Sequence, residues 1–265
     1  MIPVLFKIPL PFLNQPFEVR AYGVLIALGF LLILPLAIRQ ARKEGISSNT
    51  IIDVGFWGLL MGLIGARVLY IVTEWEAYKA DLVSIFYLWE GGLVFYGGLL
   101  AGCATLIFYA KKKHIPLGKL LDVGAPAVAF VHFFGRLGCL AAGCCFGKPT
   151  QLPWGIFFKN PEAFARPLNT PLHPTQIYEM GGLLFLFVFL YFVLSKYKKF
   201  DGQLALSYLI LYSVFRFVVE FFRGDDIRGF VIPNLISTSQ FVSLVIFLVT
   251  VPVFIYFYKK AKIKR

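Results

Sequence analysis

The stretch LALSYLILYSVFRFVVEFFRGDD, from Leu204 to Asp226, is apolar enough and long enough to cross a bilayer. Within it Arg216, Glu220 and Arg223 stand at i, i+4 and i+7, which puts three charges on one stripe of the expected helix. Charged side chains are costly inside a membrane, so a stripe of this kind marks a functional site by default. Two arginines beside one glutamate favour an anionic ligand.

The composition of the whole chain is that of a protein embedded in a membrane. Of its 265 residues, 58% are hydrophobic and only 15% are charged, and the mean hydropathy is +0.75. A soluble core of this length cannot bury so much apolar surface. We therefore expect an all-α polytopic membrane protein. Residues Met1 to Glu18 lack the pattern of a secretory signal, so no cleavage is expected.

Apolar runs of spanning length predict seven transmembrane helices. They cover Tyr22–Ile38, Ile51–Thr73, Gly92–Tyr109, Leu117–Phe134, Ile177–Leu194, Leu204–Phe222 and Gln240–Tyr258. The long connection from Gly135 to Gln176 is rich in glycine, proline and aromatic residues, which predicts a small irregular extracytoplasmic cap at about 135–176. No repeat or linker indicates a second domain, so residues 1–265 are expected to form a single membrane domain.

Basic residues fall in every second connection between these runs, and this alternation predicts the orientation of the chain. They are Arg39, Arg42 and Lys43, then Lys111, Lys112, Lys113 and Lys119, then Lys196, Lys198 and Lys199, and finally Lys259, Lys260, Lys262, Lys264 and Arg265. By the positive-inside rule these segments are cytoplasmic, so the N-terminus and the cap face outward and the C-terminus faces the cytoplasm. The net charge of +12 is then a signal of topology and of contact with anionic membrane lipid, and no nucleic-acid partner is expected.

Polar residues inside the apolar runs gather in the outer half of the expected membrane. They lie in the runs or at their outer ends and include Tyr22, Arg67, Tyr96, Arg136, His173, Tyr178 and Glu179, together with the stripe already described. Guanidinium groups at the depth of lipid headgroups suit a phosphate, because arginine offers a fixed fork of donors. A phospholipid headgroup is therefore the expected ligand, with Glu220 orienting Arg216 and Arg223. For Arg223, a role as an interface anchor explains the position equally well.

Two segments are rich in glycine: GGLVFYGGLLAG, from Gly91 to Gly102, and GRLGCLAAGCCFG, from Gly135 to Gly147. Small residues at this spacing let helices or an elongated ligand approach closely, and they free backbone N–H groups for an anion. For the first segment, helix packing alone is the favoured interpretation.

Six motifs occur in an order that resembles one known family along nearly the whole chain. They are VRAYG at Val19–Gly23, GAR with Tyr70, GGLVFYGGLLAG, GRLGCLAAGCCFGKPT, HPTQIYE at His173–Glu179 and LYSVFRFVVEFFRGDD at Leu211–Asp226. The chain resembles the phosphatidylglycerol–prolipoprotein diacylglyceryl transferases. The resemblance implies a bacterial inner-membrane enzyme that transfers the diacylglyceryl group of phosphatidylglycerol to the lipobox cysteine thiol of prolipoprotein signal peptides. A thioether forms and glycerol 1-phosphate leaves, and no cofactor is expected.

The resemblance and the chemistry together give the expected site. The reaction requires a held phosphate, a thiolate and an aligned glyceryl carbon. Arg136 and Arg216 are expected to hold the phosphate, supported by Arg67 and Arg223. The expected catalytic residues are Arg136, Arg216, Glu220, Tyr96 and Tyr22, and the expected substrate-binding residues are Arg67, Arg223, Tyr212, Gly97, Gly98, Gly138, Gly143, Gly147, His173 and Tyr178.

The chain departs from the family pattern at two places. Tyr96 stands where the family commonly has a histidine, and Cys139, Ala142 and Cys144 replace two asparagines and a glutamate of its signature. Tyr96 is expected to act as a hydrogen-bonding group, and His173 is an alternative base that a role at a helix start also explains. The departures leave open a paralogue with another acceptor or lipid. A transporter and a non-catalytic lipid-binding protein are the alternatives from other classes.

Three cysteines lie close together in the sequence, as C-x4-C-C at Cys139, Cys144 and Cys145. This pattern lacks the second ligand pair of common zinc motifs, so no metal site is expected. A disulfide between Cys139 and one of the pair is the alternative if the segment meets an oxidising compartment. Because the acceptor thiol comes from the substrate, these cysteines are not expected to carry the reaction.

Overall fold

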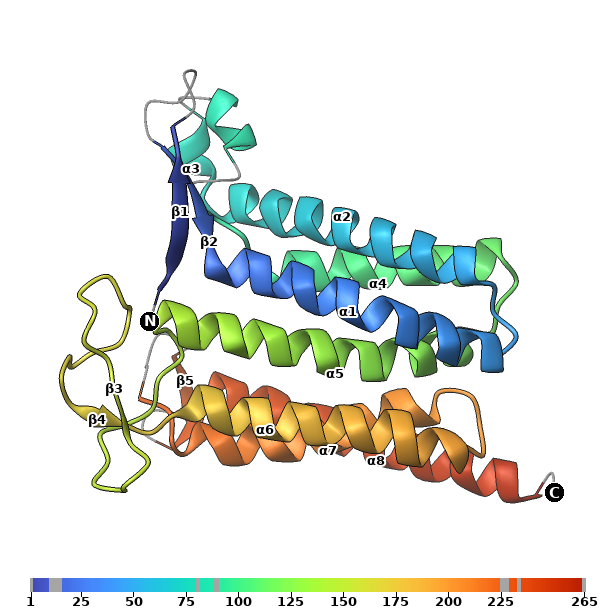
Figure 1. Cartoon of the computed structure of the whole chain (residues 1–265). Coiled ribbons are helices and arrows are strands. Elements are labelled where there is room, and N and C mark those ends of the chain that lie inside the picture. The colour runs from blue at the N-terminus through green and yellow to red at the C-terminus, as the bar shows by residue number, and fades with distance from the viewer. Residues whose placement is uncertain are drawn as a thin grey trace. The chain divides into compact units, whose positions relative to one another are not determined.

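A computed structural model describes residues 2–9, 16–79, 82–87, 91–224, 229–232 and 235–263 (Figure 1). Its long helices are α1 (Ala21–Lys43), α2 (Ser48–Thr73), α4 (Phe95–Lys112), α5 (Leu117–Ala142), α6 (Thr175–Val188), α7 (Gln203–Glu220) and α8 (Thr238–Ile263). A π turn at Phe189–Val193 and a 3-10 turn at Leu194–Lys196 continue α6. The shorter elements are α3 (Trp75–Tyr78) and a 3-10 helix at Leu82–Phe86.

The fold class expected from the sequence, an all-α polytopic membrane protein, is confirmed. Within the described ranges, six helices are long and apolar enough to cross a membrane: α1, α2, α5, α6 with its two turns, α7 and α8. The remaining expected span, Gly92–Tyr109, overlaps α4, which has 18 residues and ends in Lys111 and Lys112. These lysines reduce its apolar character, so seven spans stay a prediction. Asp225, Asp226, Lys264 and Arg265, on which the sequence interpretation also drew, lie outside the described residues.

The chain divides into two compact units, and each is described by itself. The first unit comprises Met1–Leu34 and Leu121–Arg265, and the second comprises Pro35–Leu120. Both boundaries fall inside helices, one in α1 and the other in α5. A single membrane domain stays a prediction.

The second unit is held together by contact between the backbones of α2 and α4. A Cβ atom added at Gly97 would lie 2.2 Å from the carbonyl oxygen of Gly65, and one at Gly65 would lie 2.5 Å from that of Gly97. A side chain at either position would therefore force the two helices apart. This close approach is the helix packing that the glycine spacing in the sequence favours.

The first unit begins with a two-stranded antiparallel sheet that leads into α1. Strand β1 (Val4–Ile8) pairs with β2 (Phe17–Arg20), and α1 starts at the next residue. Glycine again allows close contacts between helices: a Cβ at Gly29 would lie 2.8 Å from Phe134 on α5, and one at Gly182 on α6 would lie 2.3 Å from Phe215 on α7. The helices of this unit therefore approach one another where glycine leaves room for an aromatic ring.

Helix α7 begins against a carboxylate supplied by α5. Asp122 is fully buried and accepts hydrogen bonds from the backbone N–H groups of Gly202 at 2.8 Å, Leu204 at 2.7 Å and Ala205 at 3.2 Å. Its Oδ2 also lies 3.0 Å from Lys198 Nζ. The first N–H groups of a helix have no partners within the helix, so Asp122 acts as a cap provided by a different helix.

Helix α7 ends at Glu220, earlier than the stripe in the sequence predicts. Phe221 and Phe222 form a turn, and Arg223 then pairs with Gly147 in an isolated antiparallel bridge. Two further backbone hydrogen bonds hold this crossing, from Lys148 N to Phe222 O at 2.9 Å and from Gly224 N to Phe146 O at 3.2 Å. The expected placement of Arg223 on one helical stripe with Arg216 and Glu220 is therefore wrong.

The cap begins later than expected, because α5 runs on to Ala142. Gly143 then ends the helix with a φ of +69°, a conformation that glycine adopts without strain. The cap carries a short antiparallel pair, β3 (Ile156–Phe157) and β4 (Pro171–Leu172). It also has a small core of its own, formed by Phe158, Ala163, Ala165 and Leu172.

Candidate functional site

One buried carboxylate lies at the centre of the candidate site in the first unit. Glu179, on α6, is fully buried. Its Oε2 lies 2.8 Å from Arg136 Nη2, and its Oε1 lies 3.7 Å from Arg216 Nη1 and 3.4 Å from Arg223 Nη1. Three arginines from separate parts of the chain therefore meet one acceptor away from solvent. A buried charge requires such pairing, because desolvation otherwise disfavours it strongly.

Arg216 has a second carboxylate partner on its own helix. Its Nη2 lies 2.6 Å from Oε2 of Glu220, one turn further along α7. The hydroxyl of Ser237 donates to Glu220 Oε1 at 2.8 Å, and Arg216 Nη2 donates to the Oγ of Ser239 at 3.2 Å. The start of α8 thus fixes the ion pair from the other side, which limits the rotation of the guanidinium plane.

Arg136 is oriented by its neighbours on α5 and α7. Its Nε donates to His132 Nε2 at 3.3 Å, so that nitrogen of His132 acts as an acceptor. The His132 ring meets Tyr212 edge to face at 5.4 Å between centroids, and Tyr212 stacks on Tyr208 at 5.6 Å. Tyr212, expected from the sequence to bind substrate, therefore lies beside the arginine cluster. His132, to which the sequence interpretation gave no role, is a partner of that cluster.

The charges of the cluster decide what it can bind. Three guanidinium groups face two carboxylates, so the five side chains together carry one excess positive charge. Arginine stays protonated under all ordinary conditions and presents planar pairs of N–H donors. Such a site is suited to one anionic group with several acceptor oxygens, of which a phosphate diester is the simplest example.

Glycines of the GRLGCLAAGCCFG segment make close contacts around this cluster. A Cβ at Gly138 would lie 2.9 Å from the Cα of Tyr22, so α5 and the start of α1 are in direct contact there. At Gly147 a Cβ would lie 2.4 Å from His173 Cβ, and at Gly143 it would lie 2.7 Å from Ala163 Cβ. These contacts account for the glycines through packing. Substrate binding by Gly138, Gly143 and Gly147, and a catalytic role for Tyr22, stay predictions.

His173 and Tyr178 belong to a small aromatic group beside the cap. The Nδ1 of His173 lies 3.2 Å from the hydroxyl of Tyr178, and that hydroxyl accepts a hydrogen bond from Trp154 Nε1 at 2.8 Å. The His173 ring also meets Phe222 at 5.3 Å between centroids. The backbone of His173 accepts a hydrogen bond from Gly147 N at 3.0 Å, so it positions the start of α6 as well.

Arg67 lies in the second unit, where backbone carbonyls surround its guanidinium group. All five of its N–H donors have carbonyl partners: Ile85 at 2.9 Å, Ser84 at 2.9 Å, Tyr87 at 3.3 Å, Gly91 at 2.7 Å and Gly92 at 3.3 Å. The rings of Tyr70 and Tyr78 lie within 5.9 Å and 5.3 Å of its Cζ. These contacts favour a role in shaping the connection between α2 and α4. Support of a bound phosphate by Arg67 stays a prediction.

Tyr96, Gly97 and Gly98 also lie in the second unit, at the start of α4. The Tyr96 side chain is 57% exposed, and its ring meets Phe95 edge to face. Gly97 and Gly98 face Gly65 and Gly62 of α2. Roles for these three residues in catalysis or substrate binding stay predictions.

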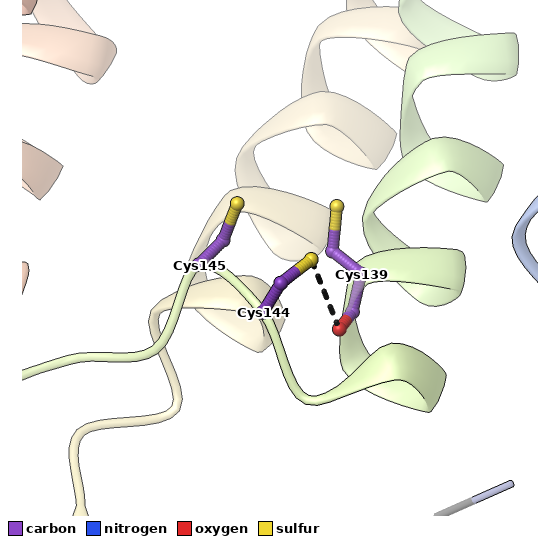
Figure 2. A group of neighbouring side chains, drawn as sticks. All are labelled: Cys139, Cys144 and Cys145. Carbon is purple, nitrogen blue, oxygen red and sulfur yellow. Dashed lines mark hydrogen bonds between the residues drawn. The ribbon is translucent and has the colours of Figure 1, made fainter. Parts of the chain in front are cut away.

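The three cysteines come together at the end of α5, as Figure 2 shows. Cys139 lies in the last turns of that helix, and Cys144 and Cys145 follow it on the turn. Their Sγ atoms all lie within 4.8 Å of one another. The thiol of Cys144 donates to the carbonyl of Cys139 at 3.7 Å (Figure 2). Polar contact with the thiols of Cys139 and Cys144 lowers the pKa of the Cys145 thiol, and the positive charges of Arg223 and Arg136 act in the same direction.

The sequence interpretation placed Glu179 among the polar residues of the outer half but gave it no role in the site. The HPTQIYE motif contains it, and a glutamate near the start of a membrane span is itself an unusual residue. Its three arginine partners are on other segments, and spacing along one helix cannot predict such contacts. Ser237 and Ser239 were missed for the same reason: Ser237 lies directly before α8 and Ser239 in its first turn, whereas their partners lie on α7.

Comparisons with known proteins agree with the motifs. The family model for prolipoprotein diacylglyceryl transferase matches residues 3–256. The chain is 38% identical over 258 residues to a phosphatidylglycerol–prolipoprotein diacylglyceryl transferase of Clostridium tetani, covering 97% of each chain. It is 36% identical to that of Finegoldia magna, covering 93% of this chain and 94% of the relative, and 32% identical to that of Lactobacillus acidophilus, covering 97% and 92%.

Proposed function

This chain belongs to the prolipoprotein diacylglyceryl transferase family, and from that membership we propose that it transfers the diacylglyceryl group of phosphatidylglycerol to the lipobox cysteine of a prolipoprotein. It is a transferase of the first step of lipoprotein maturation. In the transfer a bond between the glyceryl carbon and a phosphate oxygen breaks, and a bond from the same carbon to the cysteine sulfur forms. The electron pair of the broken bond stays on the phosphate oxygen, which leaves in glycerol 1-phosphate, and the proton released by the thiol balances the charge that this leaving group gains.

The observation that carries the proposed site is the arrangement of Arg136, Arg216 and Arg223 around Glu179. A phosphate diester has one negative charge, which matches the one excess positive charge of the cluster. The departing phosphate gains charge as the carbon–oxygen bond breaks. Guanidinium groups already fixed in place stabilise that charge without reorganising, and such electrostatic stabilisation is a major contribution to catalysis.

The two carboxylates keep the arginines in position for this task. Glu179 and Glu220 hold the guanidinium groups at ion-pair distance, and Ser237 and Ser239 hold the second of these pairs. An arginine held this way presents its remaining face to the substrate at little cost in conformational entropy. The same positive field lowers the pKa of an acceptor thiol that enters the site, which raises its thiolate fraction.

The topology proposed for this reaction places the site in the outer half of the membrane. Phosphatidylglycerol and the signal peptide of the prolipoprotein then reach it from within the bilayer, and the cap lies over its outer side. The alternation of lysine-rich connections in the sequence supports this orientation. It also supports a multi-pass location in the bacterial inner membrane, with the C-terminus in the cytoplasm.

Reconstitution tests the proposal directly. The purified chain is placed in liposomes that contain phosphatidylglycerol, and a peptide with a lipobox cysteine is added. Mass spectrometry should detect a peptide heavier by one diacylglyceryl group. Two controls should give no product: liposomes of phosphatidylethanolamine alone, and a peptide with serine in place of the cysteine. Absence of product from phosphatidylglycerol, with the protein intact and folded, would contradict the proposed activity.

A further inference from the structure

Three thiols stand beside the arginine cluster, and the proposed transfer does not use them. Cys139, Cys144 and Cys145 have their Sγ atoms within 4.8 Å of one another (Figure 2). The acceptor thiol of the reaction comes from the peptide, so these sulfur atoms need a different explanation. Packing alone does not require three cysteines to face one another.

The backbone around the thiols holds them in this arrangement. Cys145 has a φ of +61°, a conformation that side chains other than glycine rarely adopt. Two buried residues at the start of α6 fix the turn: the side chain of Gln176 donates to the carbonyl of Cys144 at 2.8 Å, and the hydroxyl of Thr175 donates to that of Cys145 at 2.7 Å. The strained turn and these two hydrogen bonds hold the Sγ atom of Cys145 within 4.8 Å of that of Cys139 on α5.

We propose that Cys139, Cys144 and Cys145 form a binding site for a thiophilic divalent cation of the Zn²⁺ class, with three thiolate ligands and an exchangeable fourth position. In a tetrahedral zinc site with Zn–S bonds of about 2.3 Å, the sulfur atoms are about 3.8 Å apart. The Sγ atoms of the three cysteines, all within 4.8 Å of one another, lie near that separation. Sulfur ligands select against Mg²⁺ and Ca²⁺, which take oxygen.

The surrounding charges favour such a complex. Three thiolates around one divalent cation carry one net negative charge, and the positive charges of Arg223 and Arg136 act on this position. Positive groups that would repel a bare cation therefore stabilise the thiolate complex as a whole. The sequence interpretation grouped these three cysteines but predicted no metal site, because C-x4-C-C lacks the second ligand pair of common zinc motifs. In the structure α5 extends beyond its expected end at Phe134 and brings Cys139 to the turn.

Metal analysis of the full-length protein in detergent tests the proposal. The protein is reduced, stripped with a chelator, incubated with Zn²⁺ and passed through a desalting column. We expect one retained Zn²⁺ per chain, and with Co²⁺ we expect near-ultraviolet absorption from thiolate-to-metal charge transfer. Cys139→Ser, Cys144→Ser and Cys145→Ser should each weaken Zn²⁺ binding by about 100-fold or more. Cys103→Ser, on α4, is the matched control and should bind as the unmodified protein does.

Alkylation of the unmodified protein gives a second measurement that does not depend on the folding of any variant. Bound Zn²⁺ should protect three cysteines from a maleimide and leave Cys103 reactive. Three results would each overturn the proposal: no stoichiometric retention by the unmodified protein, retention by the serine variants equal to that of the unmodified protein, or a disulfide between Cys139 and a neighbouring cysteine that resists reduction. Transfer to the lipobox peptide is measured on the same samples. If the unmodified protein retains no Zn²⁺ but transfers the diacylglyceryl group, the metal site alone is refuted; if it retains Zn²⁺ but does not transfer, the proposed function alone is refuted.

Discussion

The Nη2 atom of Arg136 lies 2.8 Å from the Oε2 atom of Glu179, although the two residues belong to different helices. The same carboxylate faces Arg216 and Arg223 through its other oxygen. Glu179 therefore links α5, α6, α7 and the turn after α7 at one buried point. Its removal should affect every arginine of the proposed phosphate site at once.

Glu179→Gln should abolish most transfer and lower the thermal stability of the protein. Removing one partner of a buried ion pair costs about 3–5 kcal/mol, because the remaining charges stay desolvated. Glu220→Gln should also reduce activity, but by less, since Glu179 continues to face the three arginines. Liposome transfer assays and thermal unfolding in detergent measure both effects. If Glu179→Gln were as active as the unmodified protein, the cluster would have no part in the reaction.

Arg216→Lys should lose most activity even though the charge is retained. A lysine ammonium is a point charge and cannot make the planar, paired contacts that a guanidinium group offers to a phosphate. We expect a decrease of about 10- to 100-fold in the transfer rate, in the range found when a donor to a developing anion is removed. Arg20→Lys, at an exposed ion pair with Glu18, is the control and should leave the transfer rate unchanged. Full turnover by Arg216→Lys would assign Arg216 to packing.

Tyr96→Phe should slow transfer without weakening the binding of phosphatidylglycerol, if the hydroxyl does the work that the family gives to a histidine. The substitution removes one hydrogen-bonding group and keeps the ring. Tyr96→His should be tolerated. Rates and lipid binding are measured separately in liposomes. An active Tyr96→Phe together with an inactive His173→Ala would move thiol activation to His173 and its neighbour Tyr178.

Arg67→Lys should destabilise the second unit, because a lysine has three donors for the five carbonyls that Arg67 now satisfies. Each buried acceptor left without a donor costs about 1–3 kcal/mol. We expect a lower midpoint of thermal unfolding and faster hydrogen exchange around Ser84–Tyr87. Unchanged stability combined with weaker binding of phosphatidylglycerol would instead place Arg67 in the lipid site.

The orientation of the chain can be tested by labelling single cysteines in intact cells. In a background without native cysteines, Lys262→Cys at the end of α8 should resist a membrane-impermeant maleimide, and Lys148→Cys in the cap should react. The positive-inside rule predicts this outcome from the alternating lysine-rich connections. Reaction at position 262 in intact cells would reverse the proposed topology.

Sequence alone predicted the helical framework well, because apolar length decides where a membrane helix lies. The predicted second span ends at Thr73, as α2 does, and the predicted fifth span starts at Ile177, two residues inside α6. The prediction ended the fourth span at Phe134 because hydropathy falls at Arg136, whereas α5 continues to Ala142. That arginine remains in the helix because Glu179 neutralises it, and no pattern within α5 contains this information.

The sequence predicted part of the arginine cluster. The contacts that it did not predict join segments that are far apart in the chain. Spacing of i and i+4 predicted the pair of Arg216 and Glu220, which lies within one helix. The same rule misplaced Arg223, because α7 ends at Glu220 and the chain turns to meet Gly147. The carbonyl partners of Arg67 and the meeting of the three cysteines depend on where connections fold back, which local sequence does not specify.

Asp122 has a consequence for the order of biogenesis. The carboxylate that completes the first turn of α7 belongs to α5, a helix that the ribosome delivers two long helices earlier. Until α7 docks on α5, the N–H groups at its start depend on water or on lipid headgroups for partners. Docking of α7 on α5 is therefore favoured over contact with a helix that has no carboxylate at this position. The first turn of α7 is completed only when α5 is already in place, so folding of this late part of the chain depends on a helix that is made earlier.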